Sequence, residues 1–515
     1  MKKYIYIIAN IVLVSMFTSC EDDLNQIPLS QGTTENFYST QNDFEQALNA
    51  TYSIAFHGSG TYGYGNRVLN LSETRSDNYY ATTQASRDWE GINNFFTSLS
   101  SNGLVREAYV SNYNAIYKAN QFIEQIALKG NEVIPVDAER TAMEAEAHFL
   151  RAFCYFDLLR WYGRVPLIDK TLSPQEVATV ERTAVTEVYN LIISDLEFAV
   201  ANLPEPDAIA AADYGRVSKY GAKGILALVY MTRSSADYGI QGSTLGLDEW
   251  SKAYQQLNDI KASGKYAFSD NYEAIFRVEG SSNKENVLVV PYTQNTGNGV
   301  GSNFMVELGY EPYFASLGLS QQGSLEYRPI SSSFLSTFDE TDERRNFGIV
   351  EDFTVASGTL AGDYFDRPTS IKYIDVSRYG NGREDWGVDF IVMRYTDVLM
   401  LMAECTLHGG GGSQADVDDI VNDVRERAGL ARDASNITLD QLFAERRKEF
   451  FGEGTRWFDL IRSGNAVTTM NAWKNLEDTS NSIGTINENS LLYPIPLQEM
   501  LAAPDLYDQN PGYDN

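Results

Sequence analysis

The stretch ERRKEFFGEGTRWFDLIRSG, from Glu445 to Gly464, combines a dense run of charged residues with large apolar side chains at helical spacing. Arg446 and Arg447 are spaced to meet carboxylates one helical turn away. Buried arginine and glutamate side chains normally come in pairs, because an unpaired charge in the protein interior is costly. We therefore predict an ion-pair network that joins two helices, in preference to a ligand site, from these residues: Glu445, Arg446, Arg447, Glu449, Glu453, Arg456 and Asp459.

Helical periodicity also extends through much of the chain before this stretch. Residues 108–126 and 144–168 place apolar side chains three and four positions apart, and the second of these helices should stop at Trp161-Tyr162-Gly163. Further helices are predicted over 186–203, 215–231 with Ser218 as its cap, 250–262, 392–405 and 415–428. Successive helix pairs predict a mainly α fold, a tetratricopeptide-like scaffold of helical hairpins. The repeat signature is degenerate, so the pattern indicates hairpins and not a counted repeat.

Two regions differ in character from this helical frame. Residues 280–386 are rich in Gly, Ser, Asn and Tyr, and the region is too long for one simple loop. Residues 36–89 are of the same kind apart from a short helix at 42–52. We expect a loop-rich irregular lobe, and the aromatic residues in both regions make a binding face there plausible.

The N-terminus has the layout of a secretory signal, with Lys2 and Lys3 ahead of an apolar run over 4–14. This run is about 11 residues long, short of the roughly 20 needed for a helix to span a bilayer. Cys20 follows small and polar residues, which is what bacterial lipoprotein processing requires. We predict that Cys20 is lipidated, with several acyl chains such as palmitate giving a stable membrane anchor.

The overall composition narrows the classes of ligand. The 515 residues carry a formal charge of −30, which disfavours nucleic acid as a partner, because binding a polyanion needs a basic footprint. Sulfated or uronate-rich ligands would likewise need a local basic pocket. The chain has 32 Tyr and 25 Phe, many in loop-like stretches, which suggests a flat, uncharged ligand such as a sugar ring. Cys154 and Cys405 lie in helical stretches and are predicted to be small core residues.

The residues offer little support for an enzyme. The three histidines His57, His148 and His408 show no metal-ligand spacing, and we expect no metal and no cofactor. The 70 acidic residues guarantee nearby carboxylate pairs in any fold, so such a pair is weak evidence for a glycosidase.

The stretch 445–464 resembles the C-terminal signature of the SusD/RagB family of nutrient-binding outer-membrane lipoproteins. Three further segments are similar to motifs of that family, in the family's order: EAEAHFLRAFCYFDLLRWYGRVPLI (144–168), VMRYTDVLMLMAEC (392–405) and LLYPIPLQEMLAAPDLYDQNPGY (491–513). The resemblance covers nearly the whole mature chain.

This resemblance implies a non-catalytic protein on the cell exterior, anchored to the outer membrane. It would capture oligosaccharide or another nutrient and pass it to a SusC-like TonB-dependent transporter. The implied fold has four tetratricopeptide-like helix pairs and an irregular lobe. We expect a signal peptide over 1–19, an N-terminal SusD-like helical region with ligand-facing loops over 20–240, and a C-terminal region over 241–515 that includes the excursion at 280–386.

Ligand residues in this family lie in variable loops, so candidates are chosen by their chemistry. A sugar ring stacks its apolar face on an aromatic ring, and its hydroxyls meet polar side chains. Trp89 and Tyr313 are the preferred stacking platforms, whereas Asp77 resembles a position kept for folding. The candidates are Glu73, Arg75, Asn78, Tyr79, Tyr80 and Trp89 in the first region, and Tyr292, Tyr310 and Tyr313 in the second.

Two alternatives to glycan capture stay open. The ligand of the same transport system could be a peptide, or the helical repeats could serve only as an interaction scaffold. A surface glycoside hydrolase is the weakest alternative.

Overall fold

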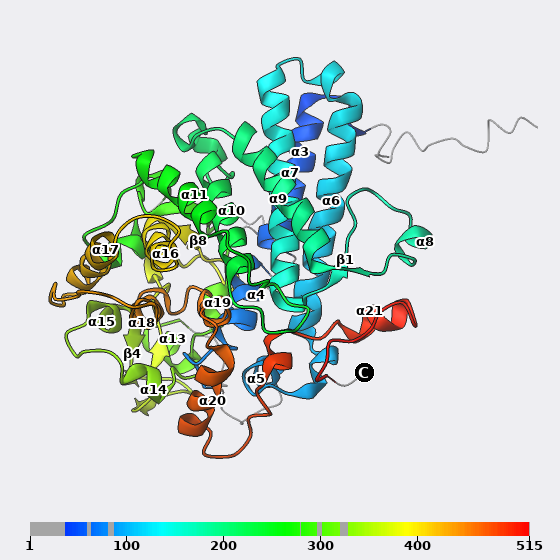
Figure 1. Cartoon of the computed structure of the whole chain (residues 1–515). Coiled ribbons are helices and arrows are strands. Elements are labelled where there is room, and N and C mark those ends of the chain that lie inside the picture. The colour runs from blue at the N-terminus through cyan, green and yellow to red at the C-terminus, as the bar shows by residue number, and fades with distance from the viewer. Residues whose placement is uncertain are drawn as a thin grey trace, which may run out of the picture.

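The computed structural model describes residues 37–58, 63–80, 87–278, 280–295, 301–319 and 328–513. The signal segment and Cys20 lie outside these residues. Helices dominate the described chain and the strands are short, so the predicted mainly α fold is confirmed (Figure 1). Among the described helices, none has the length and apolar character required to cross a bilayer.

The scaffold is a series of helices that pack on one another in chain order. In Figure 1 the first helices stand side by side, and the later ones continue the array toward the left. This arrangement confirms the predicted scaffold of helical hairpins. The series consists of α3 (Gln41–Tyr52), α6 (Gly103–Val133), α7 (Asp137–Tyr162), α9 (Val185–Asn202), α10 (Lys219–Ser234), α11 (Trp250–Ala262), α16 (Tyr395–Leu407) and α17 (Gln414–Arg427).

Local sequence signals explain several of these helix ends. The Ser218 side chain accepts a hydrogen bond from the Gly221 backbone N–H, which confirms the predicted cap and sets the start of α10. Helix α7 ends at Gly163, whose φ of 68° favours glycine, and a Cβ there would lie 2.2 Å from the Gln241 carbonyl oxygen. Cys154 and Cys405 are buried free thiols, as expected of core residues.

The helix predicted over 392–405 is wrong at its start. Residues Phe390–Arg394 form strand β8, which pairs antiparallel with β3 (Asn286–Val290), and α16 begins only at Tyr395. Both strands are rich in β-branched residues, which favour a pleated and buried surface. The pairing partner is about a hundred residues away in the sequence, so helical periodicity alone extended the helix too far.

The region 280–386 forms an irregular lobe of short elements. Besides β3 it contains α13 (Glu311–Ser316), α14 (Ser332–Leu335), α15 (Glu343–Gly348) and the strands β4 (Ile349–Val350), β5 (Phe353–Val355), β6 (Gly362–Tyr364) and β7 (Thr369–Ser370). Strand β4 pairs with β7, and β5 pairs with β6. The expected loop-rich character of this region is thus seen in its described residues.

The first loop-rich region folds differently from expectation. Helix α4 (Tyr64–Val68) continues into a π-helical turn over Leu69–Glu73, and residues 63–79 are buried. The first loop-rich region was expected to present open loops, whereas its residues 69–79 begin as a helical turn and are buried. Their polar side chains are buried because partners far away in the sequence satisfy their hydrogen bonds, as described below.

The stretch 445–464 supplies α18 (Leu439–Phe450) and α19 (Arg456–Arg462), with α20 (Ala466–Glu477) following. The turn between the first two helices contains Gly452 and Gly454, both at positive φ. A Cβ on Gly454 would lie 2.1 Å from Val68 Cγ1, so glycine lets this turn approach α4 closely.

Candidate functional site

An ion-pair network surrounds α18 and confirms the prediction made from the charged stretch. Glu449 is fully buried and lies 2.7 Å from Arg427, 2.8 Å from Arg394 and 3.4 Å from Arg344. These arginines come from α17, β8 and α15, so one carboxylate joins four elements. Burial alone would raise the pKa of Glu449, but the surrounding cations outweigh it and lower this pKa to about 2.

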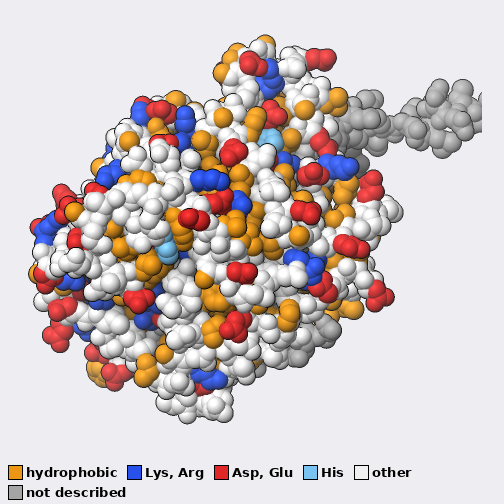
Figure 2. Space-filling model, viewed as in Figure 1, with side chains coloured by type: hydrophobic (Ala, Val, Ile, Leu, Met, Phe, Trp, Pro, Cys, Tyr) orange, Lys and Arg blue, Asp and Glu red, His pale blue; other side chains and the backbone are white. Residues whose placement is uncertain are grey.

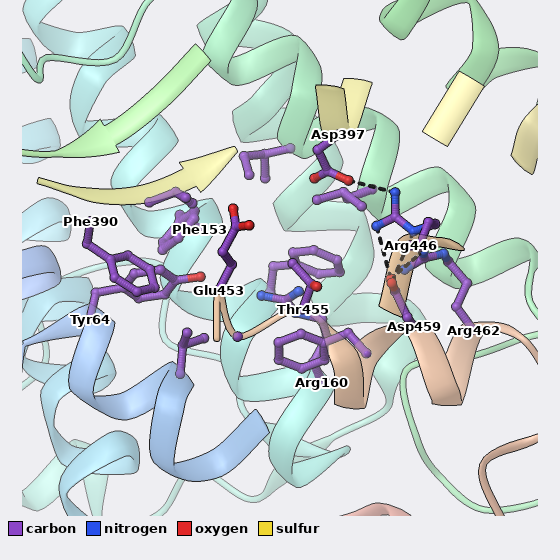
Figure 3. Close-up of a pocket in the computed structure, with 17 residues that line it drawn as sticks. Tyr64, Phe153, Arg160, Phe390, Asp397, Arg446, Glu453, Thr455, Asp459 and Arg462 are labelled. Atoms are coloured by element: carbon purple, nitrogen blue, oxygen red, sulfur yellow. Dashed lines mark hydrogen bonds and ion pairs between the residues drawn. The ribbon is translucent and has the colours of Figure 1, made fainter. Parts of the chain in front are cut away.

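A second set of ion pairs ties α18 and α19 to α16. Arg446 contacts Asp397 at 2.8 Å and Asp459 at 3.0 Å, and Arg462 contacts Glu404 at 2.6 Å. Figure 3 shows Arg446 between Asp397 and Asp459. These partners lie on other elements and not one turn away on the same helix, so the network joins more helices than the sequence indicated.

The adjoining cavity is too small for a saccharide. Figure 3 shows it lined by Tyr64, Phe153, Arg160, Phe390 and the same ion pairs. Its volume is about 50 Å³, which suits a few water molecules, whereas ligand pockets typically measure about 300–1,000 Å³.

Asp77 anchors the first loop-rich region to α18 and α19. Its buried carboxylate accepts hydrogen bonds from Arg456 Nε at 2.7 Å and Nη2 at 2.9 Å, and Arg447 Nη2 lies 3.1 Å away. Burial would raise the pKa of Asp77, but Arg447 and Arg456 outweigh it and lower the pKa to about 2. The structural role expected for Asp77 fits this geometry.

Asp77→Asn should therefore destabilise the protein in a pH-dependent way. The folded-state pKa lies below the unfolded value of 3.8, so the stabilisation is present above about pH 4 and is lost as the pH falls toward 2. The pH-dependent part amounts to about 2 kcal/mol. Urea unfolding of wild type and variant at several pH values would measure it. A stability difference that stays constant from neutral pH down to about pH 2 would contradict this assignment.

The candidates next to Asp77 hold the interior together. Glu73 is fully buried and accepts hydrogen bonds from the Gly452 N–H at 2.8 Å and the Gly454 N–H at 3.0 Å. Asn78 donates to Glu73 at 2.8 Å, and Arg75 donates to the Ile92 and Ser490 carbonyls, both at 2.8 Å. All three side chains are at most 1% exposed, as is Tyr79. In this conformation these side chains are engaged within the protein.

Tyr80 and Trp89 also pack against other side chains of the protein. The Tyr80 ring meets Trp473 edge-on at 6.2 Å. Trp89 is only 7% exposed, and the Arg328 guanidinium lies 4.7 Å from its ring centroid. Trp89 was expected to be a stacking platform, but it is almost fully buried and one side of its ring faces Arg328.

The second group of candidates contains a half-exposed aromatic cluster. Tyr292 is buried beside His57. Tyr313 lies on α13 and Tyr310 directly precedes this helix. Both are half-buried and face the β5–β6 hairpin. Across that hairpin Phe353 pairs with Tyr364, and their rings stack at 5.0 Å with an interplanar angle of 8°. Tyr313 contacts Phe353 at 5.4 Å, and Tyr310 contacts Tyr364 at 5.9 Å. We call Tyr310, Tyr313, Phe353, Tyr364 and the adjacent Phe365 the aromatic cluster.

The hairpin beside the cluster exposes apolar ring surface, and the tyrosines of the cluster add hydroxyl groups. Phe365 is 65% exposed, a high value for so large an apolar side chain. Thr354 and Asp363 form the next cross-strand pair and are exposed on the opposite face of the hairpin, with the threonine hydroxyl donating to the carboxylate at 2.8 Å. Burial raises the pKa of Tyr310 and of Tyr313, so both phenols stay protonated at neutral pH and can donate and accept hydrogen bonds.

Phe353, Tyr364 and Phe365 were missed by the sequence analysis. A local signal was available, because FTV at 353–355 and GDYF at 362–365 flank a Gly- and Ser-containing segment, the pattern of a hairpin. Cross-strand aromatic pairs are a usual stabilising unit of such hairpins.

Comparisons with known proteins identify the family. Residues 272–513 match the profile of the SusD family, and residues 29–231 match a profile described as starch-binding associating with outer membrane. A SusD-like protein P2 of Formosa agariphila is 28% identical over the full length of both chains.

Solved structures share the fold. A surface glycan-binding protein A from Bacteroides uniformis superposes with a TM-score of 0.76 at 23% identity, over 92% of this chain and 100% of that one. A surface glycan-binding protein A from Bacteroides thetaiotaomicron in complex with laminarihexaose gives a TM-score of 0.76 at 21% identity with the same coverage. The two profile matches together span most of the sequence, and the chain belongs to the SusD/RagB family.

Proposed function

We propose that this protein is a non-catalytic, cell-surface lipoprotein that binds oligosaccharides on its aromatic cluster and delivers them to a TonB-dependent transporter in the outer membrane. The observation that carries the proposal is the stacked Phe353–Tyr364 pair, with the exposed Phe365 as the next residue of the chain. Such rings match the apolar face of a sugar. The Tyr310 and Tyr313 hydroxyls, next to this pair, supply polar groups for its hydroxyls.

The comparisons support a glucan as the ligand class. One matched profile is described as starch-binding, and one structural neighbour was solved with laminarihexaose. Both are neutral glucans, which suits the surface charge. The sequence carries −30 overall, and Figure 2 shows acidic side chains spread over the visible face. From the predicted set, Tyr310 and Tyr313 stay in the proposed site, whereas Glu73, Arg75, Asn78, Tyr79, Tyr80, Trp89 and Tyr292 are assigned to the scaffold.

Affinity electrophoresis of the unlipidated chain from Glu21 onward, on a panel of neutral and acidic polysaccharides, tests this function. A band retarded by a neutral glucan supports the proposal and names the substrate. Retardation by no polysaccharide would contradict it and favour peptide capture or a scaffold role. Product formation from the same glycans would overturn the non-catalytic assignment.

Cys20→Ala tests the proposed lipid anchor. Acyl chains on Cys20 would be the main membrane attachment, because so acidic a chain has little attraction to anionic headgroups. We expect the variant to be released from the membrane fraction or to stay unprocessed, as judged by cell fractionation and immunoblotting. Normal retention of processed Cys20→Ala protein at the cell surface would count against the anchor.

A further inference from the structure

A second, larger cavity lies on the other side of α18, among α14, α18, α19 and α20. Its volume is about 340 Å³, within the range of small-molecule pockets. Arg447 and Lys448 of α18 and Arg456 of α19 line one part of it, and Asn465 and Thr469 at the start of α20 line another. It shares no residue with the aromatic cluster. We call it the basic pocket.

The cations of this pocket are only partly neutralised. Arg447 and Arg456 share the single buried carboxylate of Asp77, through Nε and Nη2 of Arg456 and Nη2 of Arg447. The Nη1 atoms of both guanidiniums make no hydrogen bond within the described part of the chain. Lys448 is half-buried and forms no ion pair with any described residue. Other carboxylates act on these cations without forming ion pairs with them: Glu477 on Arg447, and Glu445 and Asp342 on Lys448. The three side chains therefore keep N–H donors that line the cavity and are free to bind an anion.

The remaining groups around the pocket fit the same interpretation. Asp440 is the lining carboxylate, but it is exposed at the rim, with Asn465 Nδ2 donating to it at 3.4 Å. Burial and the neighbouring Arg456 together lower the pKa of Arg447 to about 10, although Asp77, Glu73 and Glu477 oppose the shift. An incoming anion would relieve this crowding of positive charge. The N-terminus of α20 has no side-chain cap, which adds a partial positive charge on the same side.

We infer that the basic pocket binds the carboxylate or sulfate group of an acidic saccharide, with Lys448, Arg447 and Arg456 as donors to the anion. Arginine and lysine make their strongest hydrogen bonds to such groups. Ser463, Asn465 and Thr469 offer polar side chains to the sugar hydroxyls, and Phe443 and Leu460 offer apolar contact. The lining of the pocket indicates that the ligand carries an anionic group. That this group belongs to a saccharide rests on the proposed function.

Calorimetric titration of the unlipidated chain tests this inference with two matched probe pairs. Digalacturonic acid is compared with its dimethyl ester, and galactose 6-sulfate with galactose. We expect at least one acidic probe to bind about tenfold or more tightly than its neutral partner, and more weakly as the salt is raised. The pair that shows this difference distinguishes a carboxylate from a sulfate.

Three variants locate the binding. Lys448→Glu reverses a charge without removing a partner of Asp77, and Thr469→Trp fills the pocket while keeping every charge. Each should weaken the acidic probe by about tenfold or more, whereas Lys261→Glu, the same charge change at the exposed end of α11, should alter it by less than about twofold. Thermal unfolding verifies that each variant is folded. If Lys448→Glu is unfolded, the binding measured with Thr469→Trp tests the inference alone.

Equal binding of acidic and neutral probes, no binding of either acidic probe, or unchanged binding in both pocket variants would overturn the inference. These outcomes are separate from a failure of the proposed function. Neutral glucan binding is measured with different ligands and depends on the aromatic cluster, which none of these three substitutions touches.

Discussion

Glu449→Gln is expected to lower the free energy of unfolding by about 3–5 kcal/mol, because it leaves three buried guanidiniums facing a neutral amide. Glu449 is fully buried, and its pKa of about 2 shows that it is ionised throughout the physiological range. Glutamine keeps the shape of the side chain but supplies only one acceptor oxygen and no charge. Arg344, Arg394 and Arg427 would keep their other carboxylate partners, which are Asp342, Glu453 and Glu285. They would lose the one carboxylate that they share at the junction of α15, β8, α17 and α18.

Urea unfolding followed by circular dichroism measures this loss as a lower midpoint. Glu426→Gln is the matched control, since Glu426 pairs with Arg432 on the surface, where the two side chains are 64% and 38% exposed. Exposed pairs of this kind contribute about 0–1 kcal/mol. Similar losses in Glu426→Gln and Glu449→Gln would contradict the role assigned to the buried network.

Tyr364→Ala combined with Phe353→Ala is expected to weaken glucan binding by at least about 30-fold, equivalent to roughly 2 kcal/mol for the loss of a central aromatic contact. The two rings are stacked on each other, so removing both deletes the whole platform and avoids partial compensation by the partner ring. The hairpin lies at the periphery of the irregular lobe, and its outer residues are exposed, so the effect on folding should be small.

Tyr117→Ala serves as the control for this pair. Tyr117 lies on α6 and is 47% exposed. Its replacement by alanine therefore removes an accessible aromatic ring from the scaffold and leaves the hairpin unchanged. Calorimetry with the glucan selected by electrophoresis should give an unchanged affinity for Tyr117→Ala. Unchanged affinity in the double variant, with a normal unfolding temperature, would exclude the aromatic cluster as the binding site.

The helical scaffold was predictable because its information is local. The apolar spacing of α7, α10 and α11, together with the Ser218 cap, marks helices without knowledge of the tertiary structure. The ion-pair network was predictable in kind from the charge density around Glu449. Its partners were not, because Arg344 lies about a hundred residues away along the chain, and only the folded structure shows which cation reaches which carboxylate.

The candidate site was predictable only in part, for the same physical reason. Glu73 and Arg75 have the chemistry of sugar ligands, but their burial depends on the turn at Gly452 and Gly454 and on Ser490, contacts of 379 to 415 residues in sequence separation. Tyr310 and Tyr313 are half-buried aromatics of the irregular lobe, and their role in binding stays a prediction. Their stacking partners on the hairpin required the local β pattern at 353–365 to be recognised.

A crystal structure of the unlipidated chain with the oligosaccharide selected by electrophoresis would test the central claim most directly. The account predicts a sugar ring lying over the aromatic cluster at van der Waals distance from Phe353, Tyr364 or Phe365, with hydroxyls hydrogen-bonded to Tyr310 or Tyr313. A sugar bound elsewhere, with all five rings of the cluster free of contact, would contradict it.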